Sequence, residues 1–451
     1  PCCQNLTQES DMITNIINSI DLLINYTNVQ SLLYIAIDGV APLAKMKQQK
    51  QRRHKSILEH KLWDTNAISP GTHFMNQLNQ SLELWKQTKS NSFTILINNS
   101  NNPGEGEHKI LQYLKQNQVY QNTVIYGLDA DLIMLGLVSK ISNLYLLRET
   151  THYNIENTES DYIYLSIDNL KTYILQDISI QSKISEDIII QDYIFLCFLL
   201  GNDFMNHIPS LNLRYKGLDY LVSTYRNLQE KYQGYFQLID ISLEYCIHMT
   251  FFKEFISELS LSEKKYLDTI HTIRNKQSKR ILSQYQSEFI DFQRYLQKNN
   301  LELSFQTIED YKLYSNNDTI NDMINHLPIF FVSQEKDILQ NKTYNESLCK
   351  DYIESLLFTT TYYFKYCIHW KYCTHYHEGP LLKYLSNYLQ LNKISFTTDY
   401  KPMTILQQLE YILPNQSHKI HSYKISHKPN TIYIPHLEFC RYLWECPIYF
   451  K

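Results

Sequence analysis

The sequence predicts an α/β fold, with a parallel central sheet flanked by helices and a mostly helical C-terminal portion. Three short apolar runs, at 32–37, 93–98 and 123–128, have the length and composition of buried strands. Each is followed by a polar or glycine-bearing loop and then by a helical pattern, which is the alternation expected of a parallel sheet. From about residue 220 the strand-like runs stop, and residues 225–315 carry Lys, Glu, Gln, Tyr and Leu at helical spacing.

Further elements continue this alternation. A fourth strand is predicted at 143–149, after a helix at 131–140. The longest apolar stretch, at 188–201, is too short to span a membrane and contains Asp192, so it predicts a buried helix.

Composition also indicates boundaries. Residues 317–330 and 333–347 are typical of a linker, and a second helical lobe is expected from about residue 346. We therefore expect three parts, namely an α/β core at 1–225, a helical insertion and linker at 226–345, and a second, mainly helical region at 346–451.

The overall charge excludes a polycationic protein that binds nucleic acid nonspecifically over its whole surface. The formal net charge is −4 over 451 residues, so any contact with nucleic acid has to be local. The nine cysteines show no repeated spacing, which favours reduced thiols over a disulfide framework. No secretory leader is visible in "PCCQNLTQES", and we expect a cytoplasmic location.

Six carboxylates stand at predicted element boundaries. The carboxyl ends of parallel strands share one edge of a sheet, so we expect these side chains to meet there. Like charges packed together raise one another's pKa, and hard divalent cations relieve that repulsion. Two ions about 4 Å apart can hold the attacking and leaving oxygens of a phosphoryl displacement. The predicted catalytic and metal ligands, for two Mg²⁺ or Mn²⁺ ions, are Asp38, Glu105, Glu107, Asp129, Asp131 and Asp203.

For any single pair of these acids, helix caps and turn residues are the simpler interpretation. The presence of all six acids at one sheet edge favours a metal site over separate caps and turns. The stretch "GEGEHK" does not suit a phosphate-binding loop, because it lacks a third glycine and its acids would repel phosphate.

The densest basic run, "AKMKQQKQRRHKS" at 44–56, follows closely behind Asp38. On a helix its positions i, i+4, i+7 and i+8 share one face. A basic face beside a metal cluster suits a terminal phosphate, although a solvated basic helix is the alternative. The residues on this face are Lys45, Gln49, Arg52 and Arg53.

Together these stretches resemble the Xrn-type 5′→3′ exoribonucleases. Weaker similarity continues at 348–356, 369–380, 401–414 and 443–450. The resembling blocks are "AIDGVAPLAKMKQQKQRR", "NAISPGTHFM", "NNPGEGEHKILQYL", "YGLDADLIMLGL", "LYLLRE" and "FLLGNDFMNHIPSL".

The frequent Asn, Ile, Tyr and Lys also suggest an AT-rich genome, viral or protist.

The resemblance implies a nuclease core similar to PIN and FEN domains, whose pocket the second helical region completes. It implies processive, Mg²⁺-dependent hydrolysis of single-stranded RNA that bears a 5′-monophosphate, in RNA or mRNA decay. The six acids would be metal ligands or their supports, and the basic face would bind the 5′-phosphate. Trp370 is the candidate for stacking on the leading base. Protein partners would be decapping or decay factors, and no membrane is expected; a nuclear or virion location is the alternative.

The chain departs from the family pattern at three places. Leu43 stands where the family usually has Arg, and Asn206 replaces a usual Pro. No strand with the family's "D-x-N-x-I-x-H" block precedes Asp38. Because the first residue is Pro rather than Met, we expect a fragment that lacks an upstream catalytic Asp.

Three rival interpretations stay open. A zinc site could be built from Cys367, His369, Cys373, His375 and His377, but their spacing matches no standard finger. A DNase similar to flap endonucleases also uses acidic clusters and two metals. A non-catalytic RNA-binding scaffold is the third.

Overall fold

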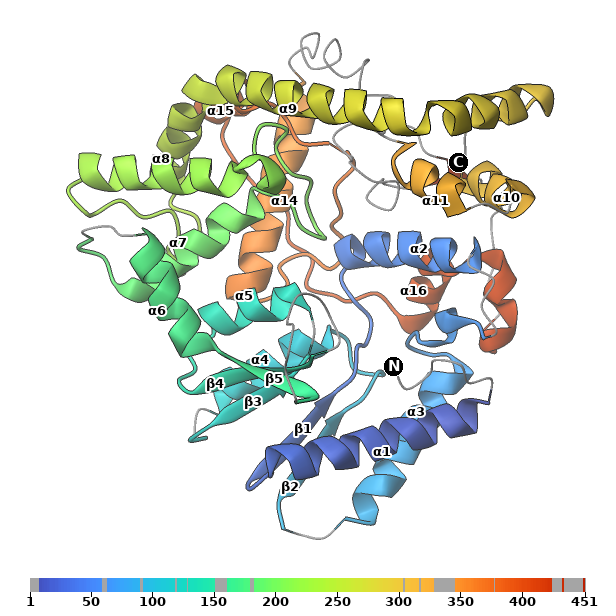
Figure 1. The fold of residues 1–451 in the computed structure, drawn as a ribbon. Coiled ribbons are helices and arrows are strands. Elements are labelled where there is room, and N and C mark those ends of the chain that lie inside the picture. Colours follow the sequence, from blue (N-terminus) through green and yellow to red (C-terminus); the bar gives the residue numbers. More distant parts are fainter. Residues whose placement is uncertain are drawn as a thin grey trace.

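Two small sheets lie in the N-terminal half of the protein, and helices surround them (Figure 1). The structure is a computed structural model. It describes residues 8–58, 63–89, 92–117, 120–127, 129–150, 160–178, 182–302, 305–315, 318–327, 345–376, 378–423, 432–433 and 449–450.

All four predicted strands form, and their order confirms the α/β class. β1 pairs with β2 in parallel and β3 pairs with β4 in parallel, while β5 adds an antiparallel strand beside β4. Within the described ranges these pairs form two separate sheets rather than one continuous sheet, and we call them the first ladder (β1 and β2) and the second ladder (β3, β4 and β5). The strands are β1 (Leu32–Ala36), β2 (Thr94–Asn98), β3 (Thr123–Tyr126), β4 (Leu144–Glu149) and β5 (Tyr162–Ser166).

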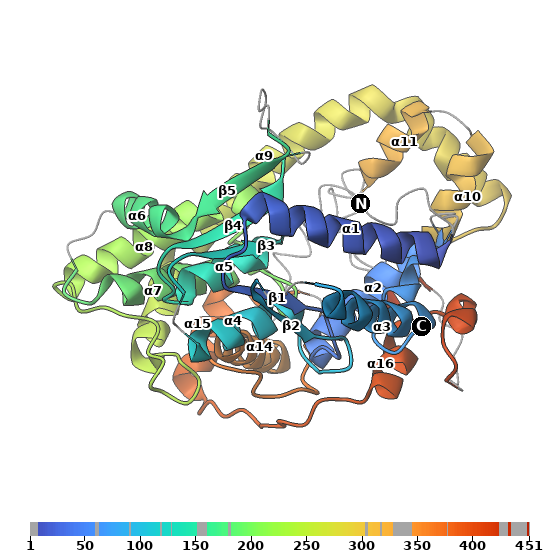
Figure 2. The same cartoon turned by 90° about the horizontal axis from the view of Figure 1, so that it is seen from below.

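Two helices build a small core beside the first ladder. α1 (Glu9–Thr27) and α3 (His73–Gln87) pack through Met12, Phe74 and Leu82, which are almost fully buried. Figure 2 shows α1 and α14 (Glu346–Phe364) on opposite sides of β1 and β2.

α2 (Leu43–Leu58), which carries the basic run, is held by a helix from the far end of the chain. Its Met46 packs against α16 (Ile405–Ile412), and the backbone N–H of Ala41 donates to Gln408 Oε1 at 3.0 Å. This buried contact sets the position of α2 above the ladders (Figure 1).

The largest core joins the second ladder to the helices of the middle and the C-terminal half. The predicted buried helix is confirmed as α7 (Glu186–Phe198). Among the described residues, no helix is long and apolar enough to cross a membrane. The helices of this core are α4 (Gly106–Gln116), α5 (Ala130–Val138), α6 (Ile167–Ile178), α7 (Glu186–Phe198), α8 (Gly217–Lys231), α9 (Met249–Lys298), α14 (Glu346–Phe364) and α15 (Leu382–Leu391).

One sequence-based expectation is wrong in part. Residues 317–330 were expected to be a linker, but α11 (Asp318–Asn325) forms there and, with α10 (Phe305–Ser315), packs beneath α9 (Figure 1). Met323 and Ile324 are fully buried, so the segment contributes to a core. Residues 333–344 lie outside the described residues.

The helical pattern from 225 is also interrupted. Between α8 and α9 the chain makes a loop closed by a bridge between Ile239 and Ile247. The remaining described elements are short: η1 (Thr65–Ala67), η2 (Leu213–Tyr215), η4 (Asn415–Ile420), β6 (Ile432–Tyr433) and β7 (Tyr449–Phe450).

A buried carboxylate fastens this loop to α7. Asp192 is fully buried and accepts hydrogen bonds from Tyr225 Oη at 2.7 Å and from the backbone N–H groups of Leu238 and Ile239. Burial raises the pKa of Asp192 to about 7, although these donors favour the charged form.

We predict that Asp192→Ala lowers the free energy of unfolding by about 2–5 kcal/mol, because three buried donors lose their acceptor. Urea unfolding followed by circular dichroism would measure it. Asp187→Ala is the control on the same helix, because Asp187 is half exposed and its pair with Lys140 is 3.6 Å long. Such surface pairs contribute at most about 1 kcal/mol, so equal losses in the two variants would contradict the prediction.

Candidate active site

The loops that follow β1 and β2 are joined by two backbone hydrogen bonds, and we call this contact between Gly39, Val40 and Gly104 the clasp. The N–H of Gly39 donates to the carbonyl of Gly104 at 2.9 Å, and the N–H of Gly104 donates to the carbonyl of Val40 at 2.8 Å. A Cβ on Gly39 would lie 1.7 Å from the carbonyl oxygen of Asn102, so only glycine allows this approach. Gly104 has φ +107°, which also favours glycine.

The clasp brings Asp38 to the N-terminus of α4. Asp38 Oδ1 accepts from the N–H of Gly106 at 2.6 Å, and Glu105 occupies the N-cap position. Lys109, one turn into α4, donates to the carbonyls of Ile37 and Asn99 at 2.7 and 3.1 Å. The ends of both strands are thereby fixed against the helix that presents Glu105 and Glu107.

Lys45 lies at the centre of the acidic cluster. Its Nζ is 3.0 Å from Glu105, 2.9 Å from Asp203 and 3.8 Å from Asp131. These carboxylates come from the start of α4, the loop after α7 and the first turn of α5. Three of the six predicted acids therefore converge on one ammonium group.

The cluster is electrostatically crowded. Burial alone would lower the pKa of Lys45, but Glu105 and Asp203 outweigh it and raise the pKa. Burial raises the pKa of Glu105 and of Asp131. Burial, followed by the charge of Glu105, raises the pKa of Glu107 to about 8. The single ammonium group of Lys45 therefore does not balance the negative charge of these carboxylates.

A potential metal-binding group lies in this cluster. Ligand atoms of Glu105, Glu107 and His108 lie within 4.8 Å of one another. Burial and then Lys45 lower the pKa of His108 to about 3, and its ring stacks on Tyr362 with centroids 3.9 Å apart. The oxygen-rich donor set, in need of positive charge, fits a hard divalent cation.

The other two predicted acids lie at the rim. Asp38 is exposed and reaches the cluster through Gly106. Asp129 is exposed at the N-cap of α5, and its charge acts on Asp131 two residues later. The six predicted acids thus surround one region, with a buried centre and an exposed edge.

The side chains of the predicted basic face have different surroundings. Lys45 faces the acids, whereas Arg52 is exposed. Gln49 Oε1 is buried with no hydrogen-bond partner among the described residues. Arg53 donates from Nε to Ser69 Oγ at 3.0 Å and from Nη2 to the carbonyl of Ile68 at 3.2 Å. Burial, followed by the charge of Arg52, lowers the pKa of Arg53 to about 10.

Trp370 lies beside the start of α2. Its carbonyl accepts from the N–H of Leu43 at 2.9 Å, and its N–H donates to the carbonyl of Asp399 at 2.7 Å. The indole is half-buried. A residue far along the chain is therefore placed next to the basic helix.

Sequence reasoning missed three side chains that hold the acids in place. Tyr362 Oη donates to Glu105 Oε1 at 2.7 Å, and Tyr363 lies beside Asp131, where it lowers the pKa of Asp131 against the larger, raising effect of burial. Gln48 Nε2 donates to Asp203 Oδ1 at 2.7 Å. Gln48 adjoins the predicted Gln49, but nothing local connects the two tyrosines to acids more than 200 residues earlier.

The zinc interpretation finds no support in the described part of the chain. The one potential metal-binding group there is the acidic one around Glu105. Cys367 and Cys373 are free thiols, and His375 pairs with Asp351. His377 lies outside the described residues.

Comparison with known proteins decides the family. The family described as "XRN 5'-3' exonuclease N-terminus" matches residues 2–62 and 55–150, and the "Xrn1 helical domain" matches residues 183–326 and 330–423, which is more than half of the chain. This chain belongs to the Xrn 5′–3′ exonuclease family. Neither match favours a flap endonuclease or a non-catalytic scaffold.

Curated relatives agree. The chain is 31% identical to 5'-3' exoribonuclease 2 of Aspergillus oryzae over 49% of this chain and 29% of that protein. It is 25% identical to the 5'-3' exoribonuclease 2 homolog of Drosophila melanogaster over 91% of this chain and 56% of that protein. The matched part is therefore only about a third to a half of the length of these relatives.

We predict that Gly39→Ala lowers any activity of the acidic site at least tenfold, because the new Cβ separates the clasped loops and moves Asp38 away from α4. Turnover measured at saturating substrate would show it. Gly136→Ala serves as the control, since its Cβ would meet only side-chain atoms of Ile167 and Leu144 at 3.2 Å or more. Full activity in Gly39→Ala would show that the clasp does not position the acids.

Proposed function

We propose that this chain is the catalytic part of a processive 5′→3′ exoribonuclease that hydrolyses single-stranded RNA with a 5′-monophosphate. The observation that carries the proposal is the convergence of Glu105, Asp131 and Asp203 on Lys45 beside a basic helix. Family membership narrows the reaction to exonuclease chemistry. RNA as the substrate and the 5′→3′ direction are the properties named for the relatives, and they are proposals here because the chain spans only part of those proteins. The single strand and the 5′-monophosphate are what the resemblance to the family implies.

The acids are the proposed ligands of Mg²⁺ or Mn²⁺, which we expect as a pair. Such ions would polarise the scissile phosphate and lower the pKa of the attacking water. Glu105, Glu107, Asp131 and Asp203 would contribute the inner oxygens, with Asp38 and Asp129 at the rim. Tyr362 and Gln48 orient Glu105 and Asp203 through their hydrogen bonds.

The proposed receptor for the 5′-phosphate consists of Lys45, Gln49, Arg52 and Arg53. Arg53 is already oriented by Ser69 and Ile68, and a guanidinium carries further N–H groups that could bind a phosphate. A receptor of this size would admit one phosphate and reject a cap or a triphosphate. Stacking of the leading base on Trp370 tolerates any base, which suits stepwise removal.

The remaining expectations are part of the proposal. The three parts of the chain would be the nuclease core, a helical insertion and a region that completes the pocket. We also propose a role in RNA or mRNA decay in the cytoplasm, with decapping or decay factors as protein partners.

The decisive experiment offers the protein that contains this chain two substrates, a 5′-monophosphorylated single-stranded RNA and a DNA flap. We expect stepwise release of nucleotides from the RNA in Mg²⁺ and none after chelation with EDTA. Clean incision of the flap with intact RNA would favour the DNase, and RNA binding without hydrolysis would favour the scaffold.

We predict that Asp203→Asn lowers the rate of hydrolysis at least 100-fold, because a charged ligand of the proposed ions becomes a neutral amide. Single-turnover kinetics with Mg²⁺ titrated upward would measure it. Asp219→Asn, on α8 outside the cluster, is the matched control. A rate that Asp203→Asn leaves unchanged would remove Asp203 from the metal site.

We predict that Arg52→Ala weakens the preference for a 5′-monophosphate over a 5′-hydroxyl about tenfold, since each charged hydrogen bond contributes about 1.5–3 kcal/mol. The ratio of kcat/KM on the two RNAs is the readout. Lys86→Ala, in the last turn of α3, is the control for loss of a surface charge. An equal loss on both RNAs would assign Arg52 to general RNA binding instead.

A further inference from the structure

The segment that follows Trp370 runs beside α2 as far as the acidic site. The carbonyl of Trp370 accepts from the N–H of Leu43, and four residues later the carbonyl of Thr374 accepts from Lys47 Nζ at 2.8 Å. Asn206 Nδ2 then donates to the carbonyl of Tyr376 at 3.2 Å, in the loop that carries Asp203. Residues 370–376 therefore lie along one edge of the proposed RNA site.

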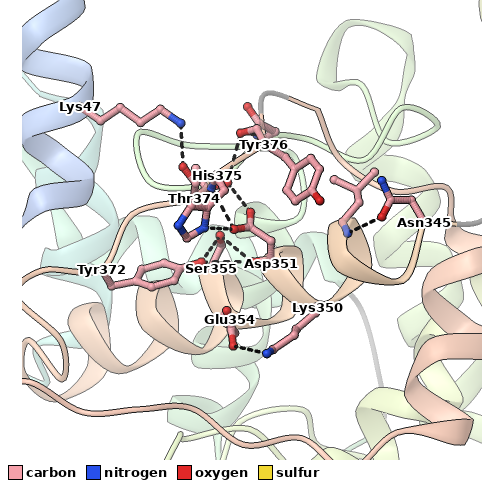
Figure 3. A network of polar contacts seen from close by, with 12 residues as sticks. Lys47, Asn345, Lys350, Asp351, Glu354, Ser355, Tyr372, Thr374, His375 and Tyr376 are labelled. Atoms are coloured by element: carbon pink, nitrogen blue, oxygen red, sulfur yellow. Dashed lines mark hydrogen bonds and ion pairs between the residues drawn. The ribbon is translucent and has the colours of Figure 1, made fainter.

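A buried carboxylate holds an exposed imidazole on this segment (Figure 3). Asp351, on α14, has a side chain that is 7% exposed, whereas the side chain of His375 is 76% exposed. Asp351 Oδ1 accepts from the backbone N–H of His375 and pairs with its Nδ1, both at 2.9 Å. Asp351 Oδ2 accepts from Thr374 Oγ1.

These contacts fix the hydrogen of the neutral imidazole. A carboxylate offers only acceptors, so the hydrogen must lie on Nδ1. The lone pair of Nε2 then points away from Asp351 toward the outside. Figure 3 shows this second ring nitrogen on the side of the ring opposite Asp351.

The arrangement is more than a structural fastening. Thr374 and the backbone N–H of His375 already tie the segment to Asp351. Holding an exposed ring as well costs side-chain entropy and buries little apolar surface. The ordering of the ring gives the edge of the proposed RNA site an oriented hydrogen-bond acceptor, Nε2 of His375.

We propose that His375 Nε2 accepts a hydrogen bond from a ribose 2′-hydroxyl of bound RNA, and that Asp351 is the positioning residue. This inference rests on the proposed function. Phosphate oxygens at neutral pH carry no hydrogen for a lone pair, and donors on bases differ with the sequence. The 2′-hydroxyl is the donor present at every nucleotide, and it is what distinguishes RNA from DNA.

The test compares binding of a 5′-monophosphorylated RNA and of DNA with the same sequence, by fluorescence anisotropy in EDTA. In His375→Phe, which keeps a ring and removes both nitrogens, the Kd for RNA should rise about five- to tenfold while the Kd for DNA stays the same. His73→Ala, an exposed histidine at the start of α3, should change neither.

The positioning role has its own comparison. Asp351→Leu should lose the same preference for RNA, whereas Asp351→Asn, whose amide oxygen can still accept from Nδ1, should retain most of it. Thermal melts identify a variant that simply unfolds. In that case the Kd of the wild type and of His375→Phe is measured for a series of RNAs that each carry one 2′-deoxy substitution. One of these substitutions should weaken binding to the wild type and leave binding to His375→Phe unchanged.

An unchanged ratio of the Kd values for RNA and DNA in His375→Phe would overturn the proposal, whether both values stay the same or both rise by the same factor. Because the readout is binding without hydrolysis, it separates this proposal from the proposed function. A wild type that prefers RNA but hydrolyses none would refute the nuclease activity alone.

Discussion

The ammonium of Lys45 is the contact on which the rest of the site depends. Three carboxylates from three different elements meet it at 2.9 to 3.8 Å. Without a cation at that point these groups would repel one another or take up protons. The position of α2 therefore sets the position of the acids, and α2 is in turn held by α16 through Met46 and Ala41.

A second dependence passes through α14. This helix is buried on nearly all sides, and it touches the site from both ends of its length. Tyr362, near its C-terminal end, orients Glu105, while Asp351, near its N-terminal end, orients His375. One rigid helix thus relates the acidic centre to the edge along α2.

Much of the fold could be predicted because its signals are local. The four strands, the buried helix around Asp192 and the acids at strand ends follow from apolar runs and their boundaries. The segment around Met323 was predicted wrongly because its polar residues outnumber the apolar ones that pack beneath α9. The fifth strand and the division into two ladders depend on pairing between distant residues, which no local pattern specifies.

The candidate site could be predicted as a set of residues but not as a set of contacts. Helical spacing placed Lys45 with Arg52 and Arg53, yet Lys45 turns toward the acids and Arg53 toward Ser69. That division depends on which charges lie opposite each side chain in the folded state. The partners Tyr362 and Asp351 are of common residue types, and only the packing of α14 gives them their roles.

The joining of Glu105 to Tyr362 also constrains how the protein is made. These residues are 257 positions apart, and Ala41 and Gln408 are 367 apart. Contacts this distant close long loops, and that closure costs chain entropy before the contact can stabilise the fold. On the ribosome, the carboxylates emerge well before the helices that complete their surroundings. The assembled centre therefore arises only when synthesis has passed α16, so a nascent chain exposes the acids before it can arrange them.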